Sequence, residues 1–311
     1  MSEALARSRG FALLGDLFLH GVTPVTRAAW SQVPDAAALL PLEADAAELH
    51  ARVVLLDLVP HEGAFRAADG LLGGDILGDL HALRARTGLE PLDEADHLGH
   101  ELRWLGFLAG AAADAARDGV SAAQLPDLER EVLDAHVLRW LPGFVAAMRA
   151  RPERTPFYDH AAELALKLAV SRRVELGGAP PNWALPPAHE VLENPRNGLR
   201  AIAEHLALPC QAGGHFARST LIGLARTLEL PAGFGNRADL IEGLLLSAAH
   251  YGRVPELAAA LRIVLAGWDA AWKELDDAGL APLAAPWRAR IHLNVQLLDR
   301  LDEAAAAHAG A

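Results

Sequence analysis

The sequence contains very little cysteine, lysine and aromatic residue. Among its 311 residues there is one cysteine, Cys210, lysine occurs only as Lys167 and Lys273, and aromatic residues make up 5%. A single thiol cannot form a disulfide within the chain, so a disulfide-stabilised scaffold is excluded. Aromatic and β-branched residues fill strands, so their scarcity disfavours a mostly β fold.

Positive charge and long apolar runs are scarce as well. Lys and Arg number 28 against 40 Asp and Glu, which gives a formal net charge of −12. This balance disfavours a nucleic-acid binder that neutralises phosphates. No segment approaches the roughly 20 apolar residues of a membrane-spanning helix, and Asp16 interrupts the short apolar run near the N-terminus, unlike a signal peptide. We therefore expect a cytoplasmic protein without a nucleic-acid partner or stable membrane insertion.

The abundant residues favour helices. Hydrophobic residues make up 52% of the chain, and Ala and Leu together supply roughly two-fifths of it, far above ordinary usage. Both are good helix formers. Leu98, Leu102, Leu105 and Leu108 recur at helical spacing, and the segment 52–58 also fits a helix. The sequence predicts an all-α fold of roughly ten or more helices.

A stretch rich in proline and glycine interrupts the helical pattern at 177–197. No regular element tolerates that density of helix breakers, so a linker or long ordered loop is expected there. We predict a helical domain over 1–176 and a further helical region over 198–311. Within the first, Asp96 occupies the position of an N-cap, and Pro142 is expected to kink or restart a helix.

The histidines raise the possibility of a metal site. His97, His100 and Glu101 share one face of a helix, and His61 and Glu62 are further candidate ligands. The order differs from the His-Glu-x-x-His of zinc proteases, and His97 as a cap of the helix start is the simpler interpretation. A helical metal-binding enzyme therefore stays open as an alternative.

No catalytic motif is recognisable in the sequence. There is no Gly-x-Ser-x-Gly elbow, and the glycine clusters at 70–74 and 233–235 lack the Gly-Lys-Ser/Thr end of a phosphate loop. Cys210 would need activation by His205 or His215 to act as a nucleophile, and a small buried hydrophobe is the simpler interpretation. We expect no catalytic residues, no metal and no cofactor.

Three stretches, taken in order, resemble one known family. They are His61-Glu62-Gly63-Ala64-Phe65 with Asp69-Gly70-Leu71-Leu72-Gly73-Gly74, then Asp96-His97-Leu98-Gly99-His100-Glu101-Leu102-Arg103-Trp104-Leu105, then His136-Val137-Leu138-Arg139-Trp140-Leu141-Pro142-Gly143-Phe144 with Thr155-Pro156-Phe157-Tyr158. Together they resemble the TorD/DmsD/NarJ family of redox-enzyme maturation chaperones over about residues 1–175. The family's Glu-Pro-x-Asp-His pattern is altered here, because Glu90-Pro91 lie three residues too early.

The resemblance implies a TorD-like helical bundle, extended by C-terminal helices, that acts without catalysis. Its implied partner is the precursor of a molybdopterin-dependent oxidoreductase, which is bound through its twin-arginine signal peptide and held back from export until the cofactor is inserted. The candidate residues for client binding are Glu62, Phe65, Asp96, His97, Glu101, Trp104, His136, Trp140 and Tyr158. Trp104 and Trp140 have a competing interpretation as core residues, as aromatic residues on helical stripes usually are.

The charge of the chain suits such a partner. A protein of net charge −12 attracts a cationic peptide, and carboxylates such as Glu62, Asp96 and Glu101 can make charge-assisted hydrogen bonds to arginine. A groove lined by apolar side chains would receive the apolar run of the peptide. A non-catalytic helical adaptor with another partner is the remaining alternative.

Overall fold

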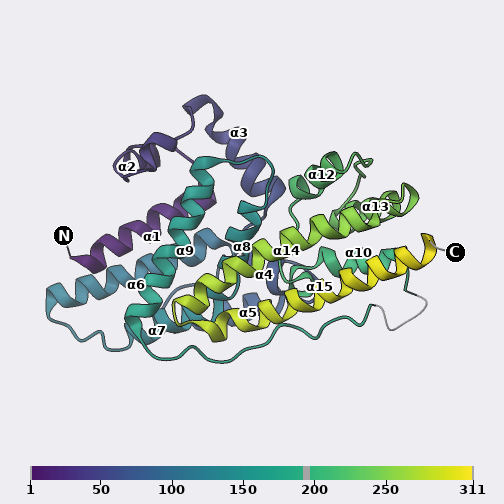
Figure 1. Ribbon diagram of the computed structural model, residues 1–311. Helices are drawn as coiled ribbons and strands as arrows, with labels where there is room; N and C mark the ends of the chain where they lie inside the picture. The colour runs from purple at the N-terminus through teal and green to yellow at the C-terminus, as the bar shows by residue number, and fades with distance from the viewer. Residues whose placement is uncertain (1, 192–196, 310–311) are drawn as a thin grey trace. The chain divides into compact units, whose positions relative to one another are not determined.

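All regular structure in the described part of the chain is helical. The structure, a computed structural model, describes residues 2–191 and 197–309, and within them it contains no strand (Figure 1). This confirms the predicted all-α fold. None of the described helices has the length and apolar character needed to cross a membrane.

The described residues form two compact units. The first comprises 2–64, 71–145 and 155–181, and the second comprises 65–70, 146–154, 182–191 and 197–309. The domain boundaries inferred from sequence remain a prediction, and residues 192–196 of the predicted linker lie outside the described residues.

The principal helices follow the apolar pattern of the sequence. Those of the first unit, some of which run on into the second, are α1 (Glu3–His20), α2 (Pro24–Trp30), α3 (Ala46–His50), α4 (Glu62–Arg66), α5 (Gly74–Ala85), α6 (Leu98–Asp118), α7 (Leu125–Val132), α8 (Leu138–Arg149) and α9 (Pro156–Leu176). Those of the second are α10 (Leu199–Ala207), α11 (Pro209–Ala212), α12 (Arg218–Thr227), α13 (Arg237–His250), α14 (Val254–Asp277) and α15 (Ala281–Ala309).

Two segments of the first unit are wound as π-helices, Ala51–Asp57 and Leu133–Val137. The first confirms that the segment 52–58 is helical. The second precedes α8, which begins at Leu138 and contains Pro142, so the helix does not restart at that proline as one of the two expectations had it. π-Helical turns inside α-helices frequently mark functional sites.

Glycine brings α1 and α6 into close backbone contact. A Cβ on Gly15 would lie 2.6 Å from the Gly99 carbonyl oxygen, and one on Gly99 would lie 2.7 Å from the Gly15 carbonyl oxygen. Any larger residue at either position would force the helices apart. This contact fixes the first turn of α6 against α1.

Residues 182–191 of the proline-rich segment belong to the second unit and are held there by hydrogen bonds. The buried Arg290 of α15 donates to the carbonyl oxygens of Pro186 and Cys210, and Gln211 donates to that of Pro187. The indole of Trp183 donates to the Leu283 carbonyl oxygen over 3.2 Å. The bonds to Pro186 and Pro187 satisfy carbonyl groups that lie outside any helix.

Candidate functional site

The Asp96 carboxylate is the centre of a buried polar cluster in the first unit. It is 1% exposed, and it accepts hydrogen bonds from the Gly63 backbone N–H over 3.2 Å and from His61 Nδ1 over 3.3 Å. Burial alone would raise the pKa of this carboxyl, but the hydrogen bond and charge of His61, with the backbone donors, lower it below its usual value. Asp96 therefore stays ionised and ties its own loop to the first turn of α4.

Backbone hydrogen bonds also join the segment around His61 to the segment around Asp96. The Glu62 N–H donates to the Asp96 carbonyl oxygen, and the Leu98 N–H donates to that of Pro60, each over 2.8 Å. His61 and His97 form an isolated antiparallel bridge between them. The centroids of their imidazole rings lie 4.8 Å apart, edge to face.

His97, not Asp96, caps helix α6. Its Nδ1 accepts the Gly99 N–H over 3.0 Å, which corrects the expectation that Asp96 is this N-cap and confirms the simpler interpretation of His97. Burial, reinforced by the nearby His61 and His100, lowers the pKa of His97 to about 3. A neutral ring fits the cap, because a protonated imidazole could not accept this bond.

Two further buried carboxylates pair across helices. His136, in the π-helical turn before α8, donates from Nδ1 to Glu62 over 2.9 Å. Trp140 Nε1 donates to Glu101 Oε2 over 3.1 Å. Glu62 and Glu101 are both 0% exposed, and a buried carboxyl group is costly unless it is hydrogen-bonded. The two pairs connect α4 and α6 with the helical run that ends in α8.

The 71–74 turn also lies close to Asp96 and to the first turn of α4. A Cβ added to Gly63 would lie 2.9 Å from Asp96 Oδ2, 3.0 Å from the Leu71 carbonyl oxygen and 3.3 Å from the Gly73 nitrogen. Glycine is therefore required where α4, the 71–74 turn and Asp96 converge. We call this convergence, made of His61, Glu62, Gly63, Asp96, His97 and His136, the polar lock.

The structure places the other predicted residues outside the polar lock. Trp104 is 3% exposed, and the guanidinium of Arg84 lies 5.6 Å from its ring centroid. Tyr158 shares a 3.1 Å hydrogen bond with His50 Nδ1, and burial raises the pKa of its phenol. Phe65 belongs to the second unit, where its ring centroid lies 5.2 Å from that of His215.

All nine predicted client-binding residues are buried. The most exposed of them, His97, has 5% of its surface accessible. None of them offers a free face to a peptide in this structure, so their role in client binding remains a prediction. His61 was absent from the predicted set although it belongs to the first motif, and its position directly before Glu62 was the available signal.

The other candidate chemistries have no support in the geometry. Burial raises the pKa of the Cys210 thiol to about 11, and its Sγ donates to the Ala67 carbonyl oxygen over 3.2 Å. Cys210 is therefore not an activated nucleophile. Among the described residues, no group of three or more His, Cys, Asp or Glu side chains is arranged to hold a metal ion.

Part of the sequence matches the model of a known family. The model of the nitrate reductase delta subunit family matches residues 22–146. The match confirms the resemblance to the NarJ/TorD type of maturation chaperone and contains the whole polar lock. This family supports a role in molybdoenzyme maturation. No curated protein sequence and no solved structure matches the chain.

Removing the Asp96 carboxylate should destabilise the protein. Asp96→Ala leaves the Gly63 N–H and a His61 N–H buried without an acceptor, so we expect the free energy of unfolding to fall by about 2 to 4 kcal/mol. Urea denaturation followed by circular dichroism measures this. The control Asp93→Ala, at an exposed position three residues earlier, should change it by less than about 0.5 kcal/mol. Equal effects of the two variants would contradict the polar lock.

The buried His97 should make stability fall in mild acid. In the unfolded chain His97 binds a proton below a pKa near 6.5, whereas in the folded protein it binds one only below a pKa of about 3. Stability should therefore fall with pH in this window by up to about 1.4 kcal/mol per pH unit from this residue.

His97→Asn keeps an N-cap acceptor but cannot be protonated. Between pH 6 and pH 4 the free energy of unfolding of this variant should depend less steeply on pH than that of the wild type, by the contribution of about one proton. Urea denaturation at each pH measures this. The control variant His250→Asn, at an exposed position, should leave the pH dependence of the free energy of unfolding unchanged. An undiminished slope in His97→Asn would contradict the neutral buried cap.

Proposed function

We propose that this protein is a cytoplasmic chaperone for the precursor of a molybdopterin-dependent oxidoreductase. It binds the twin-arginine signal peptide of that precursor and delays export until the cofactor is in place. It acts by binding and not by catalysis. The observation that carries the proposal is the polar lock, which lies inside the segment matched by the chaperone family.

The polar lock would act by positioning a surface and not by touching the peptide. It joins the loop after the first π-helix, the 71–74 turn and the 91–97 loop. The 91–97 loop is also held to α5 by a 2.9 Å hydrogen bond between His81 and the Leu92 carbonyl oxygen. The nine predicted residues would thus contribute to client binding mostly from beneath this surface.

The exposed residues on these segments have the chemistry of a signal-peptide site. Four leucines are more than half exposed, at 54% to 75%: Leu55, Leu56, Leu71 and Leu72. Exposed carboxylates accompany them on the same segments and on α5, at Asp75, Asp79, Asp93 and Glu94. The leucines would bury the apolar run of the peptide, and the carboxylates would attract its two arginines.

Calorimetry with a leader peptide from a molybdopterin oxidoreductase of the same genome tests the proposal. The peptide should bind one to one and more tightly than a scrambled peptide, and the affinity should fall as salt rises, since salt screens the charges. Leu72→Ser should weaken binding at least about fivefold, because it removes apolar contact area.

A matched control is the similarly exposed Leu246→Ser on α13, since the two leucines are 54% and 52% exposed. It should leave the affinity unchanged. Equal binding of the scrambled peptide, or equal effects of the two variants, would refute the proposed site. Binding of no leader and no precursor would favour the helical adaptor, and stoichiometric metal in untagged protein would favour the metal-binding enzyme.

A further inference from the structure

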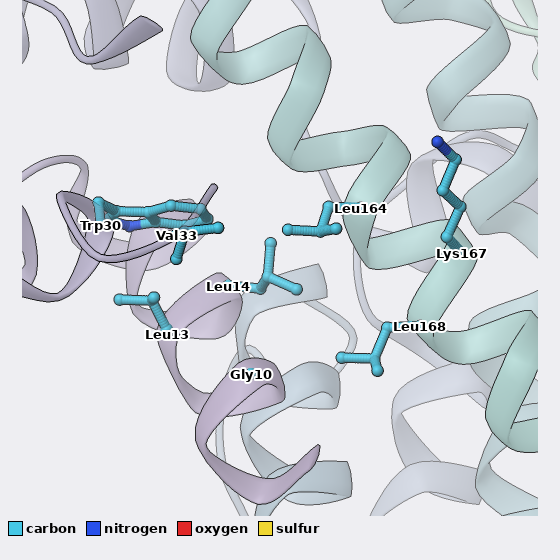
Figure 2. A pocket seen from close by; sticks show the side chains of 8 residues that line it. All are labelled: Gly10, Leu13, Leu14, Trp30, Val33, Leu164, Lys167 and Leu168. Atoms are coloured by element: carbon cyan, nitrogen blue, oxygen red, sulfur yellow. The ribbon is translucent and has the colours of Figure 1, made fainter. Parts of the chain in front are cut away.

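The first unit contains an apolar pocket that the proposed function does not use. It has a volume of about 400 Å³ and is lined by Gly10, Leu13 and Leu14 of α1, by Trp30 and Val33 at and after the end of α2, and by Leu164, Lys167 and Leu168 of α9. Figure 2 shows the leucines of α1 and α9 facing one another across it, with Trp30 at one end. The volume lies within the range of about 300 to 1,000 Å³ typical of small-molecule sites.

The indole of Trp30 is a buried donor without an acceptor. Its ring is 0% exposed and is held edge to face by Phe157, with the ring centroids 5.1 Å apart. Its Nε1 has no hydrogen-bond partner among the described residues. This nitrogen is itself buried and out of reach of an occupant, so Trp30 contributes only an apolar ring to that end of the pocket.

Lys167 supplies the pocket's cation. It is exposed, it makes no ion pair within the described part of the chain, and Lys273 is the only other lysine in the sequence. Its aliphatic stem lines the pocket while its ammonium lies at the edge, away from the leucines (Figure 2). The lining side chains therefore offer one accessible donor, the Lys167 ammonium, and no acceptor.

We propose that this pocket binds a single-chain amphiphile with a carboxylate head, of the medium-chain fatty acid class. The carboxylate pairs with the Lys167 ammonium at the edge, and the hydrocarbon chain lies between the leucines of α1 and α9 toward the ring of Trp30. An extended peptide fits less well, because its backbone N–H groups would enter an apolar pocket that has no acceptor for them. A carboxylate amphiphile brings acceptors only, all at its head.

Calorimetry of the full chain with octanoate and decanoate, each below its aggregation concentration, tests this site. Both should bind one to one, and decanoate should bind about tenfold more tightly, because it buries two more methylene groups. Lys167→Gln should weaken decanoate binding about fivefold or more. Lys273→Gln, on an exposed position of α14, should leave it unchanged.

A second variant tests the pocket without touching its charge. A Cβ on Gly10 would lie 3.3 Å from Leu168 Cδ2, so Gly10→Leu extends a side chain into the pocket and should abolish binding with the melting temperature retained. No saturable binding, equal binding of decyltrimethylammonium, or undiminished binding by both pocket variants would overturn the proposal.

Discussion

The first unit depends on the requirement that a carboxylate removed from water must be paired. Glu62, Asp96 and Glu101 are almost fully buried, and each takes its donors from a different part of the chain. Asp96 pairs with the segment before α4, Glu62 with the turn before α8, and Glu101 with α8 itself. Removing one partner would leave a buried polar group without its hydrogen bond, which is more costly than losing a surface ion pair. The positions of α4, α6 and α8 are therefore coupled.

Sequence reasoning assigned client binding to the buried carboxylates, whereas in the structure these residues hold the helices together. The buried carboxylates cannot meet the arginines of a client in this structure, because histidine, tryptophan and backbone donors already occupy them. Attraction would come instead from exposed carboxylates such as Asp75 and Asp93, and apolar contact from leucines such as Leu71. A surface fixed in advance binds with less loss of conformational entropy, which suits a protein whose work is binding.

The sequence predicted the fold class well and the local chemistry in part. Helical periodicity and composition are local signals, and they sufficed for the all-α fold and for α6. The assignment of Asp96 as the N-cap of α6 was wrong because its carboxylate caps α4, more than 30 residues away, and no local pattern reports such a partner. The helix restarts at Leu138, after the π-helical turn, and not at Pro142, which lies inside α8. The predicted client-binding set contained four members of the polar lock, Glu62, Asp96, His97 and His136, but periodicity could not tell that their side chains are buried.

Hydrogen–deuterium exchange on the full chain, with and without a saturating leader peptide, tests the central claim most directly. The account predicts slower exchange in the segments 52–57, 71–79 and 90–97, which the polar lock holds together. It predicts no change in α14 and α15, which belong to the other unit. Slowing confined to α14 and α15, or no slowing while the peptide is bound, would contradict the claim that the polar lock positions the client-binding surface.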